Sequence, residues 1–322
     1  MSAPFRSGFA ALVGRPNVGK STLINRLVGQ KLAIVSPKPQ TTRHRVLGVV
    51  NRDHAQIAFV DTPGVHQAKS PLNRWMVEVA QQAAAECDVV VFMVDADGQA
   101  KSKPTEVSDT HRFALERIAT LKKPTVLVLT KIDRVSKLAL LPLIEAYRHT
   151  YPFAEVVPLS AKSGDGLEVL VEVVSRLLPE GDRLYPDEVF TNQDERTLVA
   201  EYVREQVLKR CHDEVPHSTA VVVDHFDESE RGQDGRVEPK STSKRLTGLV
   251  RIYASVFVER ESQKAIVIGK RGQMLKTIGT DARQNIERLL GAHVYLSLQV
   301  KVAPKWSERP ERFADYGLSH ES

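Results

Sequence analysis

The first half of the chain alternates short apolar runs with longer stretches in which apolar residues recur at helical spacing. The short runs are mostly β-branched, which is typical of strands covered on both faces of a sheet. We expect strands at 9–13, 46–51, 55–60, 89–94, 125–129 and 155–159, and helices at 20–28, 71–86, 104–121, 136–150 and 167–178. This alternation predicts an α/β fold with a doubly wound, mostly parallel six-stranded sheet and one antiparallel hairpin, 46–51 with 55–60.

The pattern changes after a Pro-, Gly- and charge-rich stretch that begins at Pro179. Beyond it we expect an α+β domain, with a helix at 194–210, strands at 220–226, 249–258 and 294–302, a short helical turn at 265–268 and a helix at 280–290. Residues 227–244 are polar and are expected to form a mobile hairpin loop, because they cannot bury enough apolar surface. The predicted boundaries are a first domain at 1–180, a linker at 181–192, a second domain at 193–303 and a tail at 304–322.

Composition adds the expected environment. The 322 residues suit two domains, and 42% hydrophobic with 26% charged residues is ordinary for a soluble globular protein. No apolar stretch is long enough for a membrane span, and the N-terminus has no secretory pattern. The only cysteines, Cys87 and Cys211, are too few for a disulfide framework and fit a reducing compartment. We therefore expect a cytoplasmic protein.

The net charge of +5 is distributed unevenly along the chain. Residues 240–313 hold fifteen Lys and Arg against six Asp and Glu, a net charge of +9, so the rest of the chain carries −4. A basic block of this kind favours a polyanion-binding module in the second domain. The alternative is a solvated surface that happens to be basic.

The first candidate site is a glycine-rich loop, Gly14-Arg-Pro-Asn-Val-Gly-Lys20-Ser21, which fits the phosphate-binding pattern G-x-x-x-x-G-K-[ST]. It follows one expected strand and opens the next expected helix, as the motif requires. The backbone N–H groups of such a loop wrap a β-phosphate, and the helix N-terminus adds positive potential. Lys20 is expected to reach the β- and γ-oxygens, and Ser21 to offer its hydroxyl to Mg²⁺.

Three further motifs follow the ends of later strands: Asp61-Thr-Pro-Gly64, Thr130-Lys-Ile-Asp133 and Ser160-Ala-Lys162. Asp61 can hold a Mg²⁺-bound water, and Gly64 can present its N–H to a γ-phosphate. The Asp133 carboxylate can accept hydrogen bonds from the ring N–H and the exocyclic amine of guanine, a pair of donors that adenine lacks. The Lys131 stem can lie along the base, and 160–162 can place backbone N–H groups near the guanine oxygen.

Together the motifs predict a GTP site with Mg²⁺ as cofactor. In this order they resemble a translation-factor-class GTPase, although Thr130 stands where the usual N-K-x-D motif has Asn. A threonine hydroxyl can still tie this loop to the phosphate loop. The predicted GTP-binding residues are Gly14, Arg15, Pro16, Asn17, Val18, Gly19, Lys20, Ser21, Thr22, Asp61, Thr62, Pro63, Gly64, Thr130, Lys131, Asp133, Ser160, Ala161 and Lys162.

Residues 36–45 are expected to be the first switch, in which a threonine closes on Mg²⁺ and the γ-phosphate. We assign this role to Thr42, with Thr41 as the alternative; 62–74 is the expected second switch. Phosphoryl transfer needs mainly positioning and charge neutralisation. We assign catalysis to Lys20, Thr42 and Gly64, and metal binding to Ser21, Thr42 and, through water, Asp61.

Val65 follows Gly64 at the place where Ras-like enzymes have a water-orienting glutamine. An apolar side chain cannot orient water, so we expect slow intrinsic hydrolysis that a partner or an ion raises. Asn17 is a candidate K⁺ ligand, and the alternative is that it only shapes the loop.

A second glycine loop lies in the basic domain, in the sequence Val267-Ile-Gly269-Lys270-Arg271-Gly272. A G-x-x-G loop between helices beside a sheet matches the KH module, which clamps about four nucleotides of single strand. The predicted RNA-binding residues are Gly269, Lys270, Arg271, Gly272, Lys276, Lys301 and Lys305, with Ile268, Leu275 and Ile278 as the expected groove floor. Trp306 either stacks on RNA or anchors the tail.

One GTPase domain, a linker and one C-terminal KH domain closely resemble the bacterial Era family of GTPases. The resemblance covers nearly the whole chain and rests on the phosphate loop, Gln40-Thr-Thr-Arg-His-Arg45, Asp61-Thr-Pro-Gly64, 267–272 and Lys276-Thr-Ile-Gly279. It implies binding near the 3′ end of 16S rRNA, a role in small ribosomal subunit assembly, and peripheral association with the cytoplasmic face of the inner membrane; DNA is not an expected partner.

One alternative is a nucleotide-gated RNA-binding module of another ribosome or tRNA pathway, in which hydrolysis is incidental. The tandem-domain ribosome GTPases also end in a KH-like domain, but they carry two phosphate loops and this chain has one. A tRNA-modifying GTPase would add a C-terminal cysteine motif, which the sequence lacks.

Overall fold

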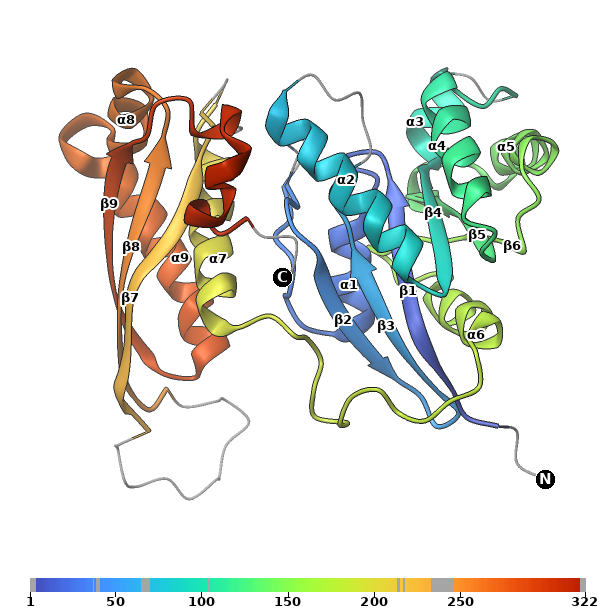
Figure 1. Ribbon diagram of the computed structural model, residues 1–322, viewed down its shortest axis with the longest axis horizontal. Coiled ribbons are helices and arrows are strands. Elements are labelled where there is room, and N and C mark those ends of the chain that lie inside the picture. Colours follow the sequence, from blue (N-terminus) through green and yellow to red (C-terminus); the bar gives the residue numbers. More distant parts are fainter. Residues whose placement is uncertain are drawn as a thin grey trace. The chain divides into compact units, whose positions relative to one another are not determined.

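The computed structural model describes residues 4–36, 38, 41–64, 70–102, 105–212, 215–216, 218–232 and 246–318. The chain divides between Asn192 and Gln193 into two compact units, which are described in turn (Figure 1). No helix among the described residues is long and apolar enough to cross a membrane.

The first unit is built on a six-stranded sheet with the strand order β2-β3-β1-β4-β5-β6. All neighbouring strands are parallel except β2 and β3, which form the predicted antiparallel hairpin. The predicted fold class is therefore confirmed for this unit. The strands are β1 (Arg6–Gly14), β2 (Val46–Asn51), β3 (Ala55–Asp61), β4 (Val89–Asp95), β5 (Thr125–Thr130) and β6 (Glu155–Pro158).

Helices cover both faces of this sheet (Figure 1). Side chains of α1 and α6 form one apolar core with one face, and those of α2, α4 and α5 form a second core with the other. Burial on both faces explains why the strands read as nearly continuous apolar runs. The helices are α1 (Lys20–Val28), α2 (Pro71–Glu86), α3 (Ala96–Ser102), α4 (Asp109–Thr120), α5 (Lys137–Thr150) and α6 (Leu167–Leu177).

The helix expected at 104–121 is wrong at its start. α4 begins at Asp109, because the Ser108 side chain accepts a hydrogen bond from the His111 N–H and caps the helix there. Pro104 lies outside the described residues. α3 was not expected, because its seven residues bury only Ala96 and Gln99 and so give no apolar period.

The stretch 181–192, which the sequence predicts as a linker, is hydrogen-bonded to the hairpin of the first sheet. Gln56 is fully buried, and its Oε1 accepts from the N–H groups of Leu184 and Tyr185 at 2.7 and 2.9 Å. Its Nε2 donates to the carbonyl oxygen of Tyr185 at 2.8 Å. On the edge strand β2, the Val49 N–H donates to the Phe190 carbonyl oxygen at 3.0 Å. The stretch is therefore part of the first unit.

The second unit has a three-stranded sheet with the order β7-β8-β9, in which β7 and β8 are antiparallel and β8 and β9 parallel. The helices α7 and α9 pack against this sheet. The predicted α+β domain is confirmed. Its elements are α7 (Glu195–Arg210), β7 (Ala220–Arg231), β8 (Gly248–Val258), α8 (Glu261–Ile268), α9 (Gln273–Leu290) and β9 (His293–Val302).

Three boundaries of the second unit differ from expectation by several residues. β7 continues to Arg231 through residues expected in a loop, because ion pairs such as Arg251 with Glu230 and Arg231 with Glu195 hold its polar end. The rest of the expected loop, 233–244, lies outside the described residues. α8 begins at Glu261 and α9 at Gln273, both earlier than expected. The interior Gly279 weakens the helical signal in the first part of α9.

The tail is anchored to the second unit by Trp306. Its Nε1 donates to the Ser218 carbonyl oxygen at 2.8 Å, and its ring is buried against Phe313 and Tyr316. Of the two roles considered for Trp306, anchoring is confirmed, since a buried ring cannot stack on RNA. The tail residues belong to two 3₁₀ segments, Trp306–Glu308 and Pro310–Tyr316.

Candidate functional site

The glycine-rich loop joins β1 to α1 and borders a cavity of about 400 Å³. Asn17 and Gly19 have positive φ values of 63° and 107°, which bend the backbone into a cradle. The side chain of Lys20 is buried, and its Nζ donates to the carbonyl oxygens of Gly14 and Arg15 at 3.2 and 3.3 Å. The ammonium group therefore lies at the loop that a phosphate would occupy.

Three oxygen-bearing side chains meet beside this loop. Ser21 Oγ donates to Asp61 Oδ2 at 2.7 Å and lies 2.8 Å from Thr42 Oγ1, which donates to the same carboxylate oxygen at 3.1 Å. They come from the start of α1, the segment before β2 and the end of β3. Thr41 instead donates to the Lys38 carbonyl oxygen at 2.9 Å. The structure thus brings Thr42, and not Thr41, to Ser21 and Asp61.

This cluster fits a magnesium ion. Mg²⁺ prefers oxygen ligands and usually keeps several waters. Asp61 is fully buried, and its Oδ1 has no side-chain hydrogen-bond donor among the described residues. Burial raises the pKa of Asp61 and lowers the pKa of Lys20, while the charge of each group opposes the shift of the other. A bound cation and a bound phosphate would restore both charged forms.

Gly64 approaches the phosphate loop so closely that no larger residue fits there. A Cβ at this position would lie 2.7 Å from the backbone nitrogen of Pro16. The Gly64 backbone lines the same cavity as Lys20 and Thr42. Val65, which stands at the place of the water-orienting glutamine of Ras-like enzymes, lies outside the described residues.

Thr130 ties the end of β5 to the phosphate loop. Its Oγ1 hydrogen-bonds to the carbonyl oxygen of Val18 at 2.8 Å and lies 3.2 Å from that of Val94. The predicted link through a threonine hydroxyl is therefore confirmed. Two carbonyl acceptors converge on a single buried hydroxyl, which holds the two loops in register.

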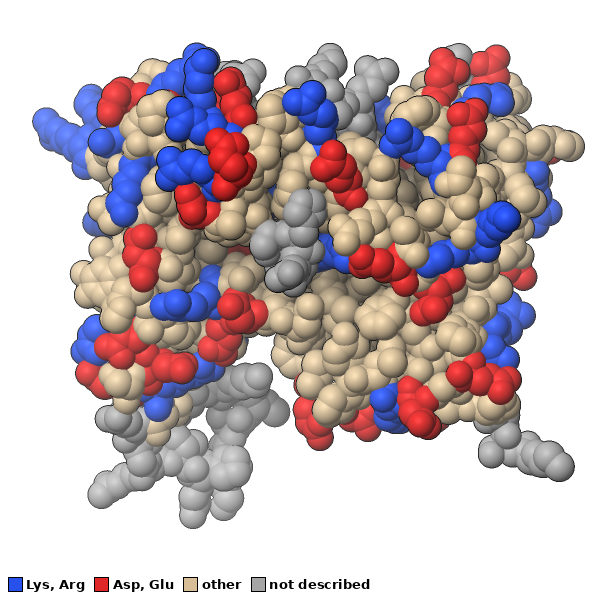
Figure 2. All heavy atoms as spheres, viewed as in Figure 1, with Lys and Arg blue, Asp and Glu red and all other residues tan. Residues whose placement is uncertain are grey.

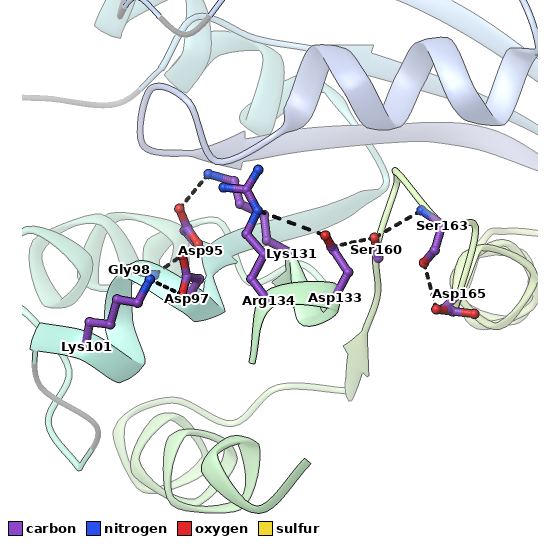
Figure 3. Close-up of polar contacts among 10 residues, drawn as sticks. All are labelled: Asp95, Asp97, Gly98, Lys101, Lys131, Asp133, Arg134, Ser160, Ser163 and Asp165. Atoms are coloured by element: carbon purple, nitrogen blue, oxygen red, sulfur yellow. Dashed lines mark hydrogen bonds and ion pairs between the residues drawn. The ribbon is translucent and has the colours of Figure 1, made fainter. Parts of the chain in front are cut away.

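The motif predicted to recognise guanine includes Lys131 and Asp133 (Figure 3). Asp133 Oδ1 accepts a hydrogen bond from Ser160 Oγ at 2.7 Å, and this bond holds the pKa of the Asp133 carboxyl below its usual range. The carboxylate is therefore ionised and oriented, as an acceptor for two N–H donors must be. Ser163 and Asp165 close the turn that carries Ser160, Ala161 and Lys162.

Asp95 is a member of this site that the sequence did not reveal. Its Oδ2 lies 2.6 Å from Lys131 Nζ, and its Oδ1 accepts from the Gly98 N–H at 3.2 Å (Figure 3). The ion pair holds the Lys131 side chain in place, while the backbone of Lys131 has a positive φ of 59°. The available signal was its position at the carboxyl end of β4, next to the strand that carries Thr130.

The second candidate site is the glycine loop of the second unit. Gly269, Arg271 and Gly272 have φ values of 70°, 52° and 77°, so the chain turns sharply between α8 and α9. The Lys270 and Arg271 side chains are exposed. A groove of about 430 Å³ runs beside the loop and is lined by Gly272, Leu275, Lys276, Gly279, Thr280, Arg283, Tyr295, Leu296, Ser297 and Leu298.

Some predicted residues of this site lie elsewhere. Ile278 is fully buried in the domain core and Ile268 does not line the groove, so Leu275 alone of the expected floor lines it. Lys301 lies near the far end of β9, 3.8 Å from Asp224 Oδ1. Lys305 is exposed and lies 3.8 Å from Glu308 Oε2. Neither lysine lines the groove, because both follow the part of β9 that does.

Comparisons with known proteins find a family match in each unit. Residues 9–131 match a family model described as a 50S ribosome-binding GTPase, and residues 214–307 match the KH domain. GTPase Era of Geotalea uraniireducens is 49% identical over 97% of this chain and 98% of the relative. GTPase Era of Syntrophus aciditrophicus is 44% identical over 99% of this chain and 97% of the relative.

Solved structures match over both units. Era in complex with MgGDPNP and nucleotides 1506–1542 of 16S ribosomal RNA superposes with a TM-score of 0.87 at 40% identity, covering 98% of this chain and 99% of that chain. A variant of Aquifex aeolicus Era bound to GDP·AlF4⁻ gives a TM-score of 0.86 at 40% identity, covering 98% of this chain and all of that chain.

Proposed function

Because the chain belongs to the Era family of GTPases, we propose that it couples GTP hydrolysis to binding of 16S rRNA near its 3′ end during small ribosomal subunit assembly. The observation that carries the proposal is the presence, in one chain, of a phosphate cradle with a Mg²⁺-compatible cluster and of a KH groove. The solved Era complex that holds MgGDPNP and 16S rRNA matches both units.

In the proposed mechanism the first unit neutralises and positions the triphosphate. Lys20 contacts the β- and γ-oxygens, the amides of the phosphate loop hold the β-phosphate, and the Gly64 N–H faces the γ-phosphate. Ser21 and Thr42 would ligate Mg²⁺ directly and Asp61 through water, and the ion would supply positive charge to the leaving phosphate. Asp133 selects guanine, and Lys131 packs along the base.

Thr42 gives this unit its switch. Its hydroxyl, in the segment just before β2, contacts Ser21 and Asp61, and a γ-phosphate would hold Thr42 in this position. After hydrolysis the segment loses that partner. The nucleotide state would thereby determine the position of Thr42, four residues before β2.

We propose that a potassium ion bound at Asn17 supplies additional positive charge near the phosphates and so raises the rate of hydrolysis. Asn17 lines the cavity, while its positive φ is one that asparagine tolerates better than most residues. Hydrolysis rates in KCl and NaCl at equal ionic strength test the proposal, with a faster rate in KCl expected. Equal rates would leave Asn17 with the loop-shaping role alone.

In the second unit, Lys270 and Arg271 would contact RNA phosphates from the exposed loop, while Leu275 and Lys276 line the groove that takes the bases. The test is crosslinking of the full chain to total cellular RNA, followed by mapping of the crosslinked positions. Enrichment of 16S rRNA near its 3′ end is expected, and enrichment of any other RNA would refute the proposed partner.

Two measurements separate a switch from an RNA-binding module with incidental hydrolysis. They are a single-turnover GTPase assay with and without that RNA, and the RNA affinity of the GTP-bound and GDP-bound protein. We expect RNA affinity to differ between the GTP and GDP states and Lys20→Ala to remove tight GTP binding. If RNA affinity is the same with either nucleotide, hydrolysis is incidental.

We also propose, from the family resemblance alone, a cytoplasmic protein that associates peripherally with the inner membrane. Co-sedimentation with anionic phospholipid vesicles is expected at low salt and should weaken as salt rises. Failure to sediment at low salt would refute membrane association.

A further inference from the structure

The three-stranded sheet of the second unit has an outer face that carries a row of aromatic rings. His225 on β7, Tyr253 on β8 and Tyr295 on β9 lie side by side, with 5.9 Å between neighbouring ring centroids. The alternate residues of β8, such as Ile252 and Ala254, are buried in the core. Tyr253 is 41% and Tyr295 52% exposed. An uncharged area with charged side chains above and below it is visible over the middle of this sheet in Figure 2.

The protein covers the other end of the same face with its own tail. Phe257, which also projects from β8 on this side, packs edge-on against Tyr316 with 5.2 Å between ring centroids. Tyr316 is in turn packed on the buried Trp306. The tail therefore covers the face at Phe257, while the rings of Tyr253 and Tyr295 stay accessible. Exposed aromatic rings in a row are unusual unless they meet a partner.

The open end of the row is continuous with the proposed RNA groove. Tyr295 belongs both to the row and to the lining of the groove, beside Lys276 and Arg283. Among the described residues no carboxylate lines the groove. A basic groove that leads onto aromatic rings is the arrangement by which proteins hold single-stranded nucleic acid, since every base has a face that can stack.

We propose that the row formed by His225, Tyr253 and Tyr295 is a stacking platform for unpaired RNA bases just outside the groove. This inference rests on the proposed RNA binding and extends its site across the sheet. The row is narrow, because the ion pairs Arg251 with Glu230 and Lys301 with Asp224 lie to either side. A strip of this shape suits a single strand better than a folded protein partner, which needs a broad apolar core.

The test compares two RNAs on the full-length protein by fluorescence anisotropy. Both derive from the 3′-terminal segment of 16S rRNA; one has about four nucleotides, which a KH groove holds, and the other is roughly three times as long. Tyr253→Ala should weaken the longer RNA about five- to a hundredfold and leave the shorter RNA unchanged. Tyr253→Phe should retain the wild-type affinity, because it keeps the ring.

Tyr295→Ala should weaken both RNAs, because this ring also lines the groove. The matched control is Phe113→Ala on α4, an aromatic that is 54% exposed in the GTPase unit and should change neither affinity. Thermal unfolding of each variant verifies that it is folded. Unchanged affinity of folded Tyr253→Ala for the longer RNA, or equal weakening for both lengths, would overturn the platform.

Gly272→Asp tests the groove separately. An acidic side chain beside the phosphate path should weaken both RNAs in the wild-type background. If Gly272→Asp weakens both and Tyr253→Ala changes neither, the groove stands and the platform fails. If Gly272→Asp has no effect, the proposed groove itself fails, and the platform that extends it fails with it.

Discussion

Thr130 Oγ1 and the Val18 carbonyl oxygen, 112 residues apart in sequence, are joined by a buried hydrogen bond of 2.8 Å. We expect Thr130→Val, which keeps the shape and removes the hydroxyl, to weaken GDP and GTP binding by about 1–3 kcal/mol, because it breaks the bond that ties this loop to the phosphate loop. The loss should be equal for both nucleotides, since the bond does not touch the γ-phosphate site. Fluorescent-nucleotide titration measures it, and a loss confined to GTP would contradict this account.

We expect Asp133 to determine which nucleotide base the protein binds. In Asp133→Asn an amide replaces one carboxylate acceptor with an N–H donor. Guanine then loses one acceptor for its N–H groups, and two donors face each other. We expect GTP affinity to fall about 10⁴-fold and xanthosine triphosphate, which presents an oxygen in place of the amine, to bind better than GTP. Competition between the two nucleotides measures the preference. A variant that still prefers GTP would place guanine selection elsewhere.

His111 makes the stability of the first unit depend on pH. Burial lowers the pKa of His111 to about 4, and its Nδ1 lies 2.6 Å from the Tyr147 hydroxyl. Since the unfolded chain has the ordinary value of 6.5, it takes up a proton between pH 6.5 and 4 while the folded protein does not. The stabilisation is present above pH 6.5 and falls by about 3 kcal/mol as the pH drops toward 4.

Urea unfolding at several pH values, with wild type and His111→Gln side by side, tests this dependence. The variant should lose less stability on acidification, because glutamine does not titrate and can still hydrogen-bond to Tyr147. An NMR titration that finds His111 protonating near 6.5 in the folded protein would refute the lowered pKa.

We expect the Gln56 side chain to contribute strongly to the stability of the first unit. Gln56→Leu would leave the N–H groups of Leu184 and Tyr185 without their acceptor, and we expect it to lower the free energy of unfolding by about 2–4 kcal/mol. Gln82→Leu is the matched control, because its amide makes only an exposed bond to Glu86 and should cost less than about 0.5 kcal/mol. Faster proteolysis near residue 185 should accompany the Gln56 change alone.

The sequence predicted that the nucleotide motifs lie together, because each motif follows a strand end and parallel strands bring their carboxyl ends to one edge. That rule places Lys20, Asp61, Thr130 and Asp133 with no knowledge of the packing. It gives no partner for Lys131, because the pairing with Asp95 depends on side-chain reach across two strands. Gln56 was missed because its partners lie in a stretch with no periodic pattern.

The KH groove was predicted less well, because the expected start of its helix was late. Helix α9 begins at Gln273. It therefore places Ile278, Ala282 and Ile286 on one buried stripe, while Leu275 and Gly279 face the groove. An expected start at 280 left Ile278 outside the helix, among the apolar neighbours of the glycine loop that were assigned to the groove floor. A boundary error of one or two turns therefore changed which side chains were assigned to RNA.

The contact between Val49 and Phe190 bears on how the GTPase unit can be isolated. β2 is one of the two edge strands of its sheet, and the Phe190 carbonyl oxygen accepts from a backbone N–H that would otherwise be open to another chain. A fragment cut at residue 180 would expose this edge and remove the partners of Gln56 at Leu184 and Tyr185. Cutting after Asn192 retains both, so the longer fragment is the one expected to stay monomeric in solution.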